Sequence, residues 1–159
     1  MLTRTYQGIK NYTTEISVEK TVGEIEKLLA TNGAKRIMKE FNDDGAIVTV
    51  SFTIDTPNGE MPIMLPARVD RLFAILKDQA ARGKIENRYC NKAQAARTSW
   101  RIIKDWVDAQ MALVAVDMVK LEEIFLPYVY DGRLGQTLFE ALEAKKVNLA
   151  RLLRAKEED

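Results

Sequence analysis

Residues 91–119 read NKAQAARTSWRIIKDWVDAQMALVAVDMV, and this stretch decides the fold. At about 100° per residue, one side of a helix collects its apolar residues Trp100, Val107, Met111, Val114 and Met118. A basic flank accompanies the first half, whereas residues 109–119 are apolar almost all round. We therefore expect one long central helix over 91–119. Its second half should be buried within the chain or against a second copy, which predicts a homo-oligomer through residues 109–119.

The segment before this helix predicts a helix followed by a β-meander. Thr21 and Glu24 form a capping-box pattern at the start of a helix that ends at Asn32-Gly33. Strands are predicted over 34–41, 46–55 and 60–65, joined by turns at Asp43-Asp44-Gly45 and at residues 56–59. Pro62 cannot donate a ladder hydrogen bond, so the third strand should lie at the sheet edge. Alternation along the second strand predicts one core face, formed by Ala46, Val48, Val50, Phe52 and Ile54.

The remaining segments complete an α+β domain. We expect helices over 67–82 and 120–125, an aromatic loop over 126–132, and a C-terminal helix with a charged tail over 137–159. Residues 1–15 are expected to form a loosely ordered extension of a single domain spanning 1–159. The predicted fold class is therefore α+β, in which a three-stranded antiparallel β-meander packs against helices around one long central helix.

Composition excludes several kinds of chemistry. The 159 residues include no histidine and one cysteine, and the formal net charge is +1. A Ser-His-Asp triad, a histidine-ligated zinc and an intrachain disulfide are therefore impossible. We expect no cofactor, no metal and no enzymatic activity, with Mg²⁺-dependent phosphodiester cleavage by Asp105, Asp108, Glu122 and Glu123 as the third alternative. No segment has the length of a signal peptide or a membrane span, which predicts a cytoplasmic protein without a membrane partner.

The first candidate site is a basic stripe on the long helix. Arg97, Arg101 and Lys104 lie beside Trp100, and guanidinium groups grip phosphates while an indole can stack on a base. The alternative is a solvated helix face with i,i+4 pairs, Arg101 with Asp105 and Lys104 with Asp108.

Two further sets complete the candidate site. Arg68 and Arg71 stand at a helix start, where unpaired backbone N–H groups favour anions, although surface salt bridges explain them equally well. Tyr89 and Tyr128, with Tyr130, lie in connections where aromatic rings often border pockets. Loop tyrosines that cap a core are at least as common.

Several segments resemble a group of small, largely uncharacterised proteins of tailed phages and prophages. They are VEKTVGEIEKLLATNGAKRIMKEF, VSFTIDTPNGEMPIMLP, ARTSWRIIKDWVDAQMALVAVDMVKLEEIFLPYV and GQTLFEAL, of which SWRIIKDWVDAQ and LEEIFLPY are the most specific. The resemblance spans about residues 18–142 and implies a phage accessory protein in the bacterial cytoplasm. It carries over no catalytic residue.

Two functions fit such a protein. The first is a non-enzymatic binder that sequesters a small anionic ligand, a nucleotide immune signal of the host, with Arg97, Arg101, Lys104, Arg68 and Arg71 on phosphates and Tyr89 or Tyr128 over the base. The alternative is an accessory factor that binds single-stranded nucleic acid during phage replication or recombination. Near-neutral charge and the polar Thr49, Ser51 and Thr53 on the open sheet face disfavour the alternative.

Overall fold

The computed structural model describes residues 8–154 and confirms the predicted α+β class. A three-stranded antiparallel sheet, in the order β1-β2-β3, consists of β1 (Ala34–Phe41), β2 (Ile47–Thr56) and β3 (Gly59–Met64). β3 is an edge strand, as Pro62 predicted, and a short hairpin continues beyond it through a bridge between Ile63 and Val129. That hairpin consists of β4 (Tyr130–Asp131) and β5 (Gln136–Thr137).

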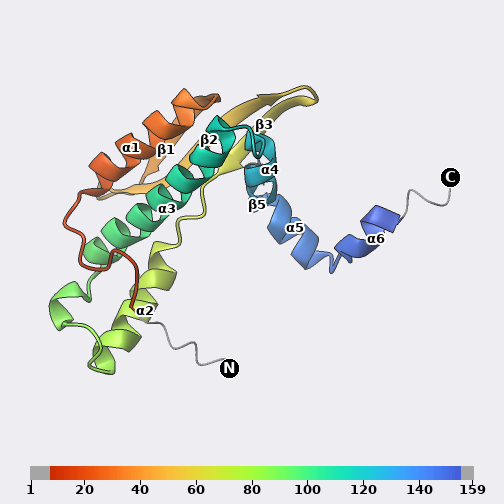
Figure 1. Ribbon diagram of the computed structural model, residues 1–159. Helices are drawn as coiled ribbons and strands as arrows, with labels where there is room; N and C mark the ends of the chain where they lie inside the picture. The colour runs from red at the N-terminus through yellow and green to blue at the C-terminus, as the bar shows by residue number, and fades with distance from the viewer. Residues whose placement is uncertain (1–7, 155–159) are drawn as a thin grey trace.

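Helices cover one face of this sheet and leave the other face open. The helical segments are α1 (Val18–Thr31), α2 (Val69–Ala81), α3 (Lys92–Ala115), α4 (Leu121–Phe125), α5 (Leu138–Ala144) and α6 (Leu149–Arg154), with 3₁₀ turns η1 (Asn87–Tyr89) and η2 (Leu126–Tyr128). α1 and α3 run side by side over the sheet, while α5 and α6 lead away from it (Figure 1). Between residues 8 and 154, no helix combines the length and the apolar character that a membrane crossing requires.

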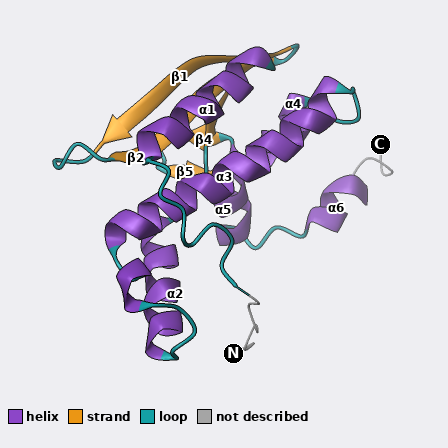
Figure 2. Ribbon diagram, turned by 60° about the vertical axis from the view of Figure 1, so that its left-hand side comes forward, coloured by secondary structure: helices purple, strands orange, loops and turns teal. Residues whose placement is uncertain are grey.

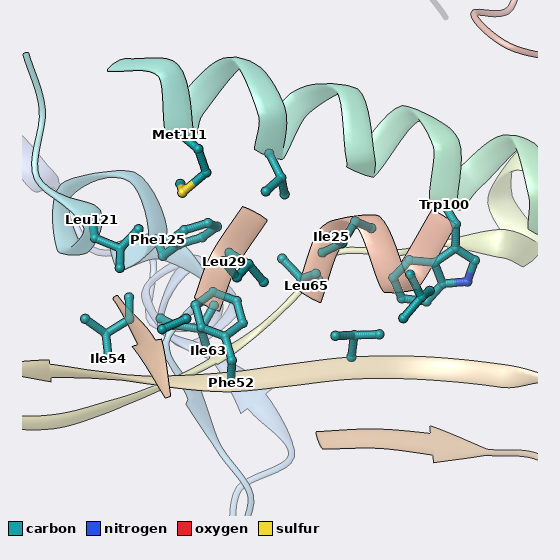
Figure 3. Packing of buried hydrophobic residues seen from close by; sticks show 14 of the residues in the cluster. Ile25, Leu29, Phe52, Ile54, Ile63, Leu65, Trp100, Met111, Leu121 and Phe125 are labelled. Carbon is teal, nitrogen blue, oxygen red and sulfur yellow. The ribbon is translucent and has the colours of Figure 1, made fainter. Parts of the chain in front are cut away.

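The core lies between α1, α3 and the covered face of the sheet. Trp100 and Met111 both point down from α3 toward the sheet, at separate places along the helix, and Phe52 of the central strand lies below the Met111 end (Figure 3). All three side chains are at most 2 % exposed. Phe125 of α4 closes one end, with its ring 5.0 Å from that of Phe52 and 5.7 Å from that of Trp106, both edge to face. The predicted apolar stripe of α3 therefore forms the centre of the core over its first two thirds.

The start of α1 differs from the predicted capping box. Ser17 is the N-cap, and its side-chain oxygen accepts from the N–H of Lys20 at 3.2 Å. Thr21 lies one turn into the helix, fully buried. The prediction was wrong because Ser17 offers the same capping chemistry one turn earlier and lets Val18 join the apolar face.

The core face of β2 differs from the predicted alternation at its start. Glu40 pairs with Thr49, but Phe41 pairs with Ile47, so β2 contains one extra residue at Val48. This bulge turns Ile47 into the core at 6 % exposure and leaves Val48 41 % exposed. Strict alternation from Ala46 was therefore wrong before Val50 and correct from Val50 to Ile54.

The long helix ends at Ala115, four residues before the predicted end. Asp117 takes a left-handed conformation (φ 59°), and the N–H groups of Asp117 and Met118 return to the carbonyls of Val114 and Leu113, both at 3.0 Å. This is a Schellman closure, in which an aspartate occupies the position that glycine usually takes. Within the described chain, the apolar residues after Ala112 are not buried as a group, because Val116 and Met118 are 62 % and 70 % exposed.

The C-terminal helix predicted over 137–155 is broken into two. Lys146 adopts a left-handed conformation (φ 51°), and the N–H of Val147 returns to the carbonyl of Leu142 at 3.1 Å, which closes α5. Asn148 then starts α6 by accepting from the N–H of Arg151. Apolar spacing alone could not reveal this break, since it rests on a lysine in a conformation that non-glycine residues rarely adopt.

The described part of the N-terminal extension is fastened to α3. The side chain of Gln94 donates to the carbonyls of Tyr12 and Thr14 at 2.7 and 3.0 Å, and the hydroxyl of Thr98 donates to the carbonyl of Asn11 at 3.1 Å. We call residues 11–14 the N-terminal strap. These polar groups of α3 can be buried because they form hydrogen bonds with the backbone of the strap rather than with water. Residues 1–7 of the predicted extension lie outside the described residues.

Removing the Phe125 ring tests the aromatic closure of the core. We expect Phe125→Ala to lower the free energy of unfolding by about 3–5 kcal/mol, because it deletes a fully buried ring that meets two others. Phe41→Ala is the matched control, since that ring is 57 % exposed, and it should change stability by no more than about 0.5 kcal/mol. Urea unfolding of both variants measures the difference, and equal losses would contradict this description of the core.

Candidate ligand-binding groove

The basic stripe on α3 is largely engaged in contacts within the chain. Arg101 pairs with Glu24 of α1, and its side chain is only 17 % exposed. Lys104 pairs with Asp108 at 3.3 Å, as the i,i+4 spacing predicted. The predicted pair of Arg101 with Asp105 is wrong, because α1 lies alongside α3 and offers Glu24 at shorter reach.

Arg97 and Trp100 complete the account of the stripe. The Nε and Nη2 atoms of Arg97 both donate to the side-chain oxygen of Gln94, at 3.1 and 2.6 Å. That contact orients the Gln94 amide toward the N-terminal strap. Trp100 is fully buried in the core, so its ring offers no surface on which a base could stack. Two residues of the stripe therefore stabilise the packing of neighbouring segments on α3: Arg101 binds α1, and Arg97 orients Gln94, which binds the strap.

Asp105 fastens the N-terminal strap from the other side. Its carboxylate accepts from the side-chain amide of Asn11 at 2.8 Å and pairs with Lys10 at 3.2 Å. Burial acts to raise the pKa of this carboxyl, but the Asn11 hydrogen bond and the nearby Lys10 and Lys104 charges outweigh it and lower the pKa. The charged form of Asp105 is therefore the one that holds the strap.

Reversing one charge tests whether Arg101 serves the fold. Arg101→Glu sets two carboxylates against each other, and we expect it to lower the free energy of unfolding by about 1–3 kcal/mol. The exchanged pair, Arg101→Glu with Glu24→Arg, should recover most of that loss in urea unfolding. Lys20→Glu, on the exposed side of α1, is the control. If Arg101→Glu leaves the free energy of unfolding unchanged, the Arg101–Glu24 pair does not stabilise the fold, and Arg101 is again a candidate for ligand binding.

The other predicted cations and rings occupy separate places. Arg71 is exposed on α2 and makes no ion pair with a residue in the described range. Tyr89 packs edge to face on Tyr12, with centroids 5.4 Å apart, and Arg88 covers its ring. Tyr89 thus helps to hold the strap. Only Arg68 and Tyr128, among the predicted site residues, meet in one hollow.

That hollow is a groove of about 330 Å³ beside the open face of the sheet. It lies where the end of β3, the start of α2, the β4-β5 hairpin and α5 converge. We call it the Arg68 groove, and its lining residues are Glu40, Thr49, Met64, Leu65, Pro66, Ala67, Arg68, Tyr128, Tyr130, Gly135, Thr137, Phe139 and Glu140. Its size falls at the lower end of the range of small-molecule sites.

Arg68 enters the groove because the chain turns sharply after β3. Pro66 follows the end of β3, and Arg68 is the N-cap of α2, which places it among the residues that line the groove. The Nη2 atom pairs with Glu140 of α5 at 2.9 Å. This contact joins two segments 72 residues apart and ties α5 to the start of α2.

Glu140 has two roles at the groove. It is the third residue of α5 in a capping box, where its carboxylate accepts from the N–H of Thr137 at 2.9 Å while the Thr137 hydroxyl accepts from its own N–H. The Thr137 N–H and then the Arg68 guanidinium hold the pKa of the Glu140 carboxyl below its ordinary range. Glu140 is therefore ionised at neutral pH and fixes both α5 and Arg68.

Three aromatic rings form the wall of the groove. Tyr128 is held by Trp106, whose ring centroid lies 5.5 Å from its own, and Trp106 in turn meets Phe125 of the core. Tyr130 begins β4, and Phe139 on α5 is 55 % exposed. Tyr128 is thus a groove residue that packs against the core, whereas Phe139 contributes an uncovered apolar surface.

The open face of the sheet supplies the polar floor. The Thr49 hydroxyl donates to the Glu40 carboxylate at 2.9 Å across the β1-β2 pair. Both lie on the face opposite the core, where Ser51 and Thr53 follow along β2. The predicted polar face therefore exists, and its first pair borders the groove.

Sequence reasoning missed most of the groove lining. Tyr130 was noted among the loop tyrosines and Thr49 on the open face of the sheet, but neither was assigned to the site, and Phe139, Glu140 and Glu40 were not noted. The S/T-x-x-E pattern from Thr137 to Glu140 was a usable signal for a capped helix start, and alternation placed Thr49 on the open face. Neither pattern shows that Arg68 lies opposite Glu140, because that contact depends on how α5 returns to the sheet.

Three of the four carboxylates considered for Mg²⁺, all except Glu122, make other contacts. Asp105 and Asp108 pair with lysines, and Glu123 accepts from the N–H of Lys120 at the start of α4. Across residues 8–154, no three His, Cys, Asp or Glu side chains gather in a way that could hold a metal ion.

Comparisons with protein-family models, curated proteins and solved structures return no match to this chain.

Acid titration tests the role of Glu140. Because its folded-state pKa is lowered, its contribution to stability is present above the ordinary glutamate pKa of about 4.3 and is lost as the pH falls through the lower folded value. We expect the melting temperature of Glu140→Gln to lie below that of the wild type at neutral pH and to converge with it in acid. Glu143→Gln, exposed on the same helix, should show no such convergence. A constant difference across pH would contradict the assignment.

Proposed function

We propose that the protein is a non-enzymatic binder of a small anionic, nucleotide-like ligand, and that the Arg68 groove is its binding site. The observation that carries this proposal is the convergence of one guanidinium and three aromatic rings on one hollow of about 330 Å³. These groups come from α2, η2, β4 and α5, which lie far apart in the sequence. Arginine binds phosphate through a planar fork, and aromatic rings stack on bases.

The mixed charge of the groove narrows the ligand class. Among the described residues that line it, Arg68 is the one cation, while Glu40 and Glu140 are carboxylates that accept hydrogen bonds. A ligand with one phosphate facing Arg68, a base against a tyrosine, and hydroxyl or amino groups facing the carboxylates satisfies all three kinds of group. A polyphosphate would bring several negative charges toward the same two carboxylates. The groove therefore favours a nucleoside monophosphate or a phosphodiester-linked cyclic nucleotide over a triphosphate.

Ligand entry is coupled to the Arg68–Glu140 pair. Both side chains are partly exposed, at 51 % and 38 %, so their ion pair is screened by water and contributes little to stability. A phosphate can take over part of the Arg68 fork while Glu140 keeps its contact with the Thr137 N–H. The pair thus holds the guanidinium in position before the ligand binds, which lowers the entropy cost of binding.

The phage resemblance supports a cellular setting for this activity. In our proposal the protein acts in the bacterial cytoplasm and sequesters a nucleotide immune signal of the host. Sequestration lowers free ligand only when the protein is in excess and its Kd lies below the threshold of the host sensor. Binding single-stranded nucleic acid, the alternative, has weaker support, because a strand requires a continuous positive path and the groove has one cation between two carboxylates.

Thermal shift with defined nucleotides tests the proposal. The panel contains nucleoside mono- and triphosphates, cyclic di- and trinucleotides, ADP-ribose derivatives and short single-stranded oligonucleotides, each at low and high salt. We expect a salt-tolerant rise in Tm with one mono- or cyclic nucleotide, which corresponds to about 4 kcal/mol at a thousandfold excess over Kd.

Variants of groove residues test whether the nucleotide binds in the Arg68 groove. Arg68→Gln and Tyr130→Ala should each weaken binding of the same nucleotide at least tenfold, or about 1.4 kcal/mol, by calorimetric titration. Arg82→Gln is the matched control, since Arg82 is equally exposed at the other end of α2 and also pairs with one carboxylate, Asp78. A shift with oligonucleotides alone, lost at high salt, would favour the alternative. The absence of any shift would remove the nucleotide proposal.

A further inference from the structure

Within residues 8–154, the apolar side chains of the last helix, α6, are left uncovered. Leu149, Leu152 and Leu153 of α6 are 56 %, 58 % and 82 % exposed, and no residue of α6 is buried. The helix stands apart from the rest of the molecule at the end of α5 (Figure 2). Isolated helices shorter than about 12–15 residues are marginal in water, so α6, with six residues, needs a surface to pack against.

A second uncovered apolar surface lies at the C-terminal end of α3. The Schellman closure at Asp117 brings Met118 back beside Leu113, and Val116 lies one turn from Leu113. These three residues, which we call the α3-end patch, are 37 %, 62 % and 70 % exposed in the order Leu113, Val116, Met118. The patch is what remains uncovered of the apolar half-helix that the sequence analysis singled out.

The charges around these two surfaces are opposite. Residues 145–154 carry four basic side chains and no acidic one: Lys145, Lys146, Arg151 and Arg154. Residues 113–123, which form the α3-end patch and the start of α4, carry three carboxylates, Asp117, Glu122 and Glu123, against the single cation Lys120. An apolar contact bordered by complementary charges fixes both the partner and the orientation.

From this complementarity we propose that α6 of one copy packs on the α3-end patch of a second copy, and that the exchange is reciprocal. α5 directs the arm formed by residues 145–154 away from the helical layer of its own chain (Figures 1 and 2), which leaves that chain's patch uncovered. In a two-fold dimer each copy gives one arm and receives one, so both apolar surfaces of both chains are covered. The proposal is independent of any ligand in the Arg68 groove.

Mass measurements on the full chain test the dimer. Light scattering after size exclusion, over a dilution series, should give twice the 18.1 kDa of one chain and a concentration-dependent return to the monomer. Leu153→Glu and Val116→Glu should each convert the dimer to a monomer at concentrations where the wild type is dimeric. Leu134→Glu, at an apolar residue 68 % exposed outside both surfaces, should remain dimeric. A wild-type monomer throughout, or a dimer that survives both variants, would overturn the proposal.

A cysteine cross-link identifies which copy receives the arm. In a Cys90→Ser background, which removes the only native thiol, Val116→Cys and Leu153→Cys are combined in one chain. Oxidation should give a covalent dimer on a denaturing gel. A faster-migrating monomer with an internal disulfide would show that the arm packs on its own chain, and would reject the exchange.

Charge reversal provides a second, independent measurement. Arg151→Glu with Arg154→Glu should weaken the dimer at least tenfold. Adding Asp117→Arg and Glu123→Arg to that chain should restore it, because both sides of the contact are then exchanged. A failure of this rescue while all four single variants keep the wild-type melting temperature would contradict the proposed pairing.

Discussion

The structure depends on one constraint, the burial of the Trp100, Val107 and Met111 side of α3 against both α1 and the sheet. A helix that packs on two neighbours at once has few free orientations, so its flanks are fixed as well. Arg101 beside this side meets Glu24 of α1, and Gln94 and Asp105 bind the N-terminal segment. The polar residues Gln94, Arg101 and Asp105 of α3 therefore serve mainly contacts within the chain. The Arg68 groove lies beside the open face of the sheet, and α3 supports it only through the contact of Trp106 with Tyr128.

This packing explains the contacts that the basic stripe makes within the chain. Helical periodicity shows correctly that Arg97, Arg101 and Lys104 share one flank, and it predicted the local pair of Lys104 with Asp108. It carries no information about the neighbouring helix, and Arg101 pairs with a residue 77 positions away. The Arg68 groove could not be predicted for the same reason. Its residues are distant in sequence, and only the return of α5 to the start of α2 brings them together.

The fold was more predictable than the site because turn chemistry is local. Asp-Gly at residues 44–45 and Pro-Asn-Gly at residues 57–59 specify tight reversals, and the strands between them alternate as half-buried strands do. Two of the errors share one cause. Asp117 and Lys146 take left-handed conformations without being glycine, and each follows the end of a helix where apolar spacing predicts continuity. The extra residue at Val48 acts similarly on β2. Periodicity of apolar residues does not reveal such positions, because it describes which side of an element is apolar and not where the backbone departs from regular geometry.

α5 connects the groove with the arm, and this connection has a thermodynamic consequence. Phe139 and Glu140 in its first turn line the groove, while Lys145 and Lys146 at its end begin the arm. The helix is only seven residues long and is fixed to the body through the Arg68–Glu140 pair and the capping box at Thr137. A ligand that takes over part of the Arg68 fork changes how firmly α5 is held, and a dimer that fixes the arm restrains α5 from its other end. Any change that the ligand makes in the dimer affinity is matched, by linkage, by an equal change that dimer formation makes in the ligand affinity.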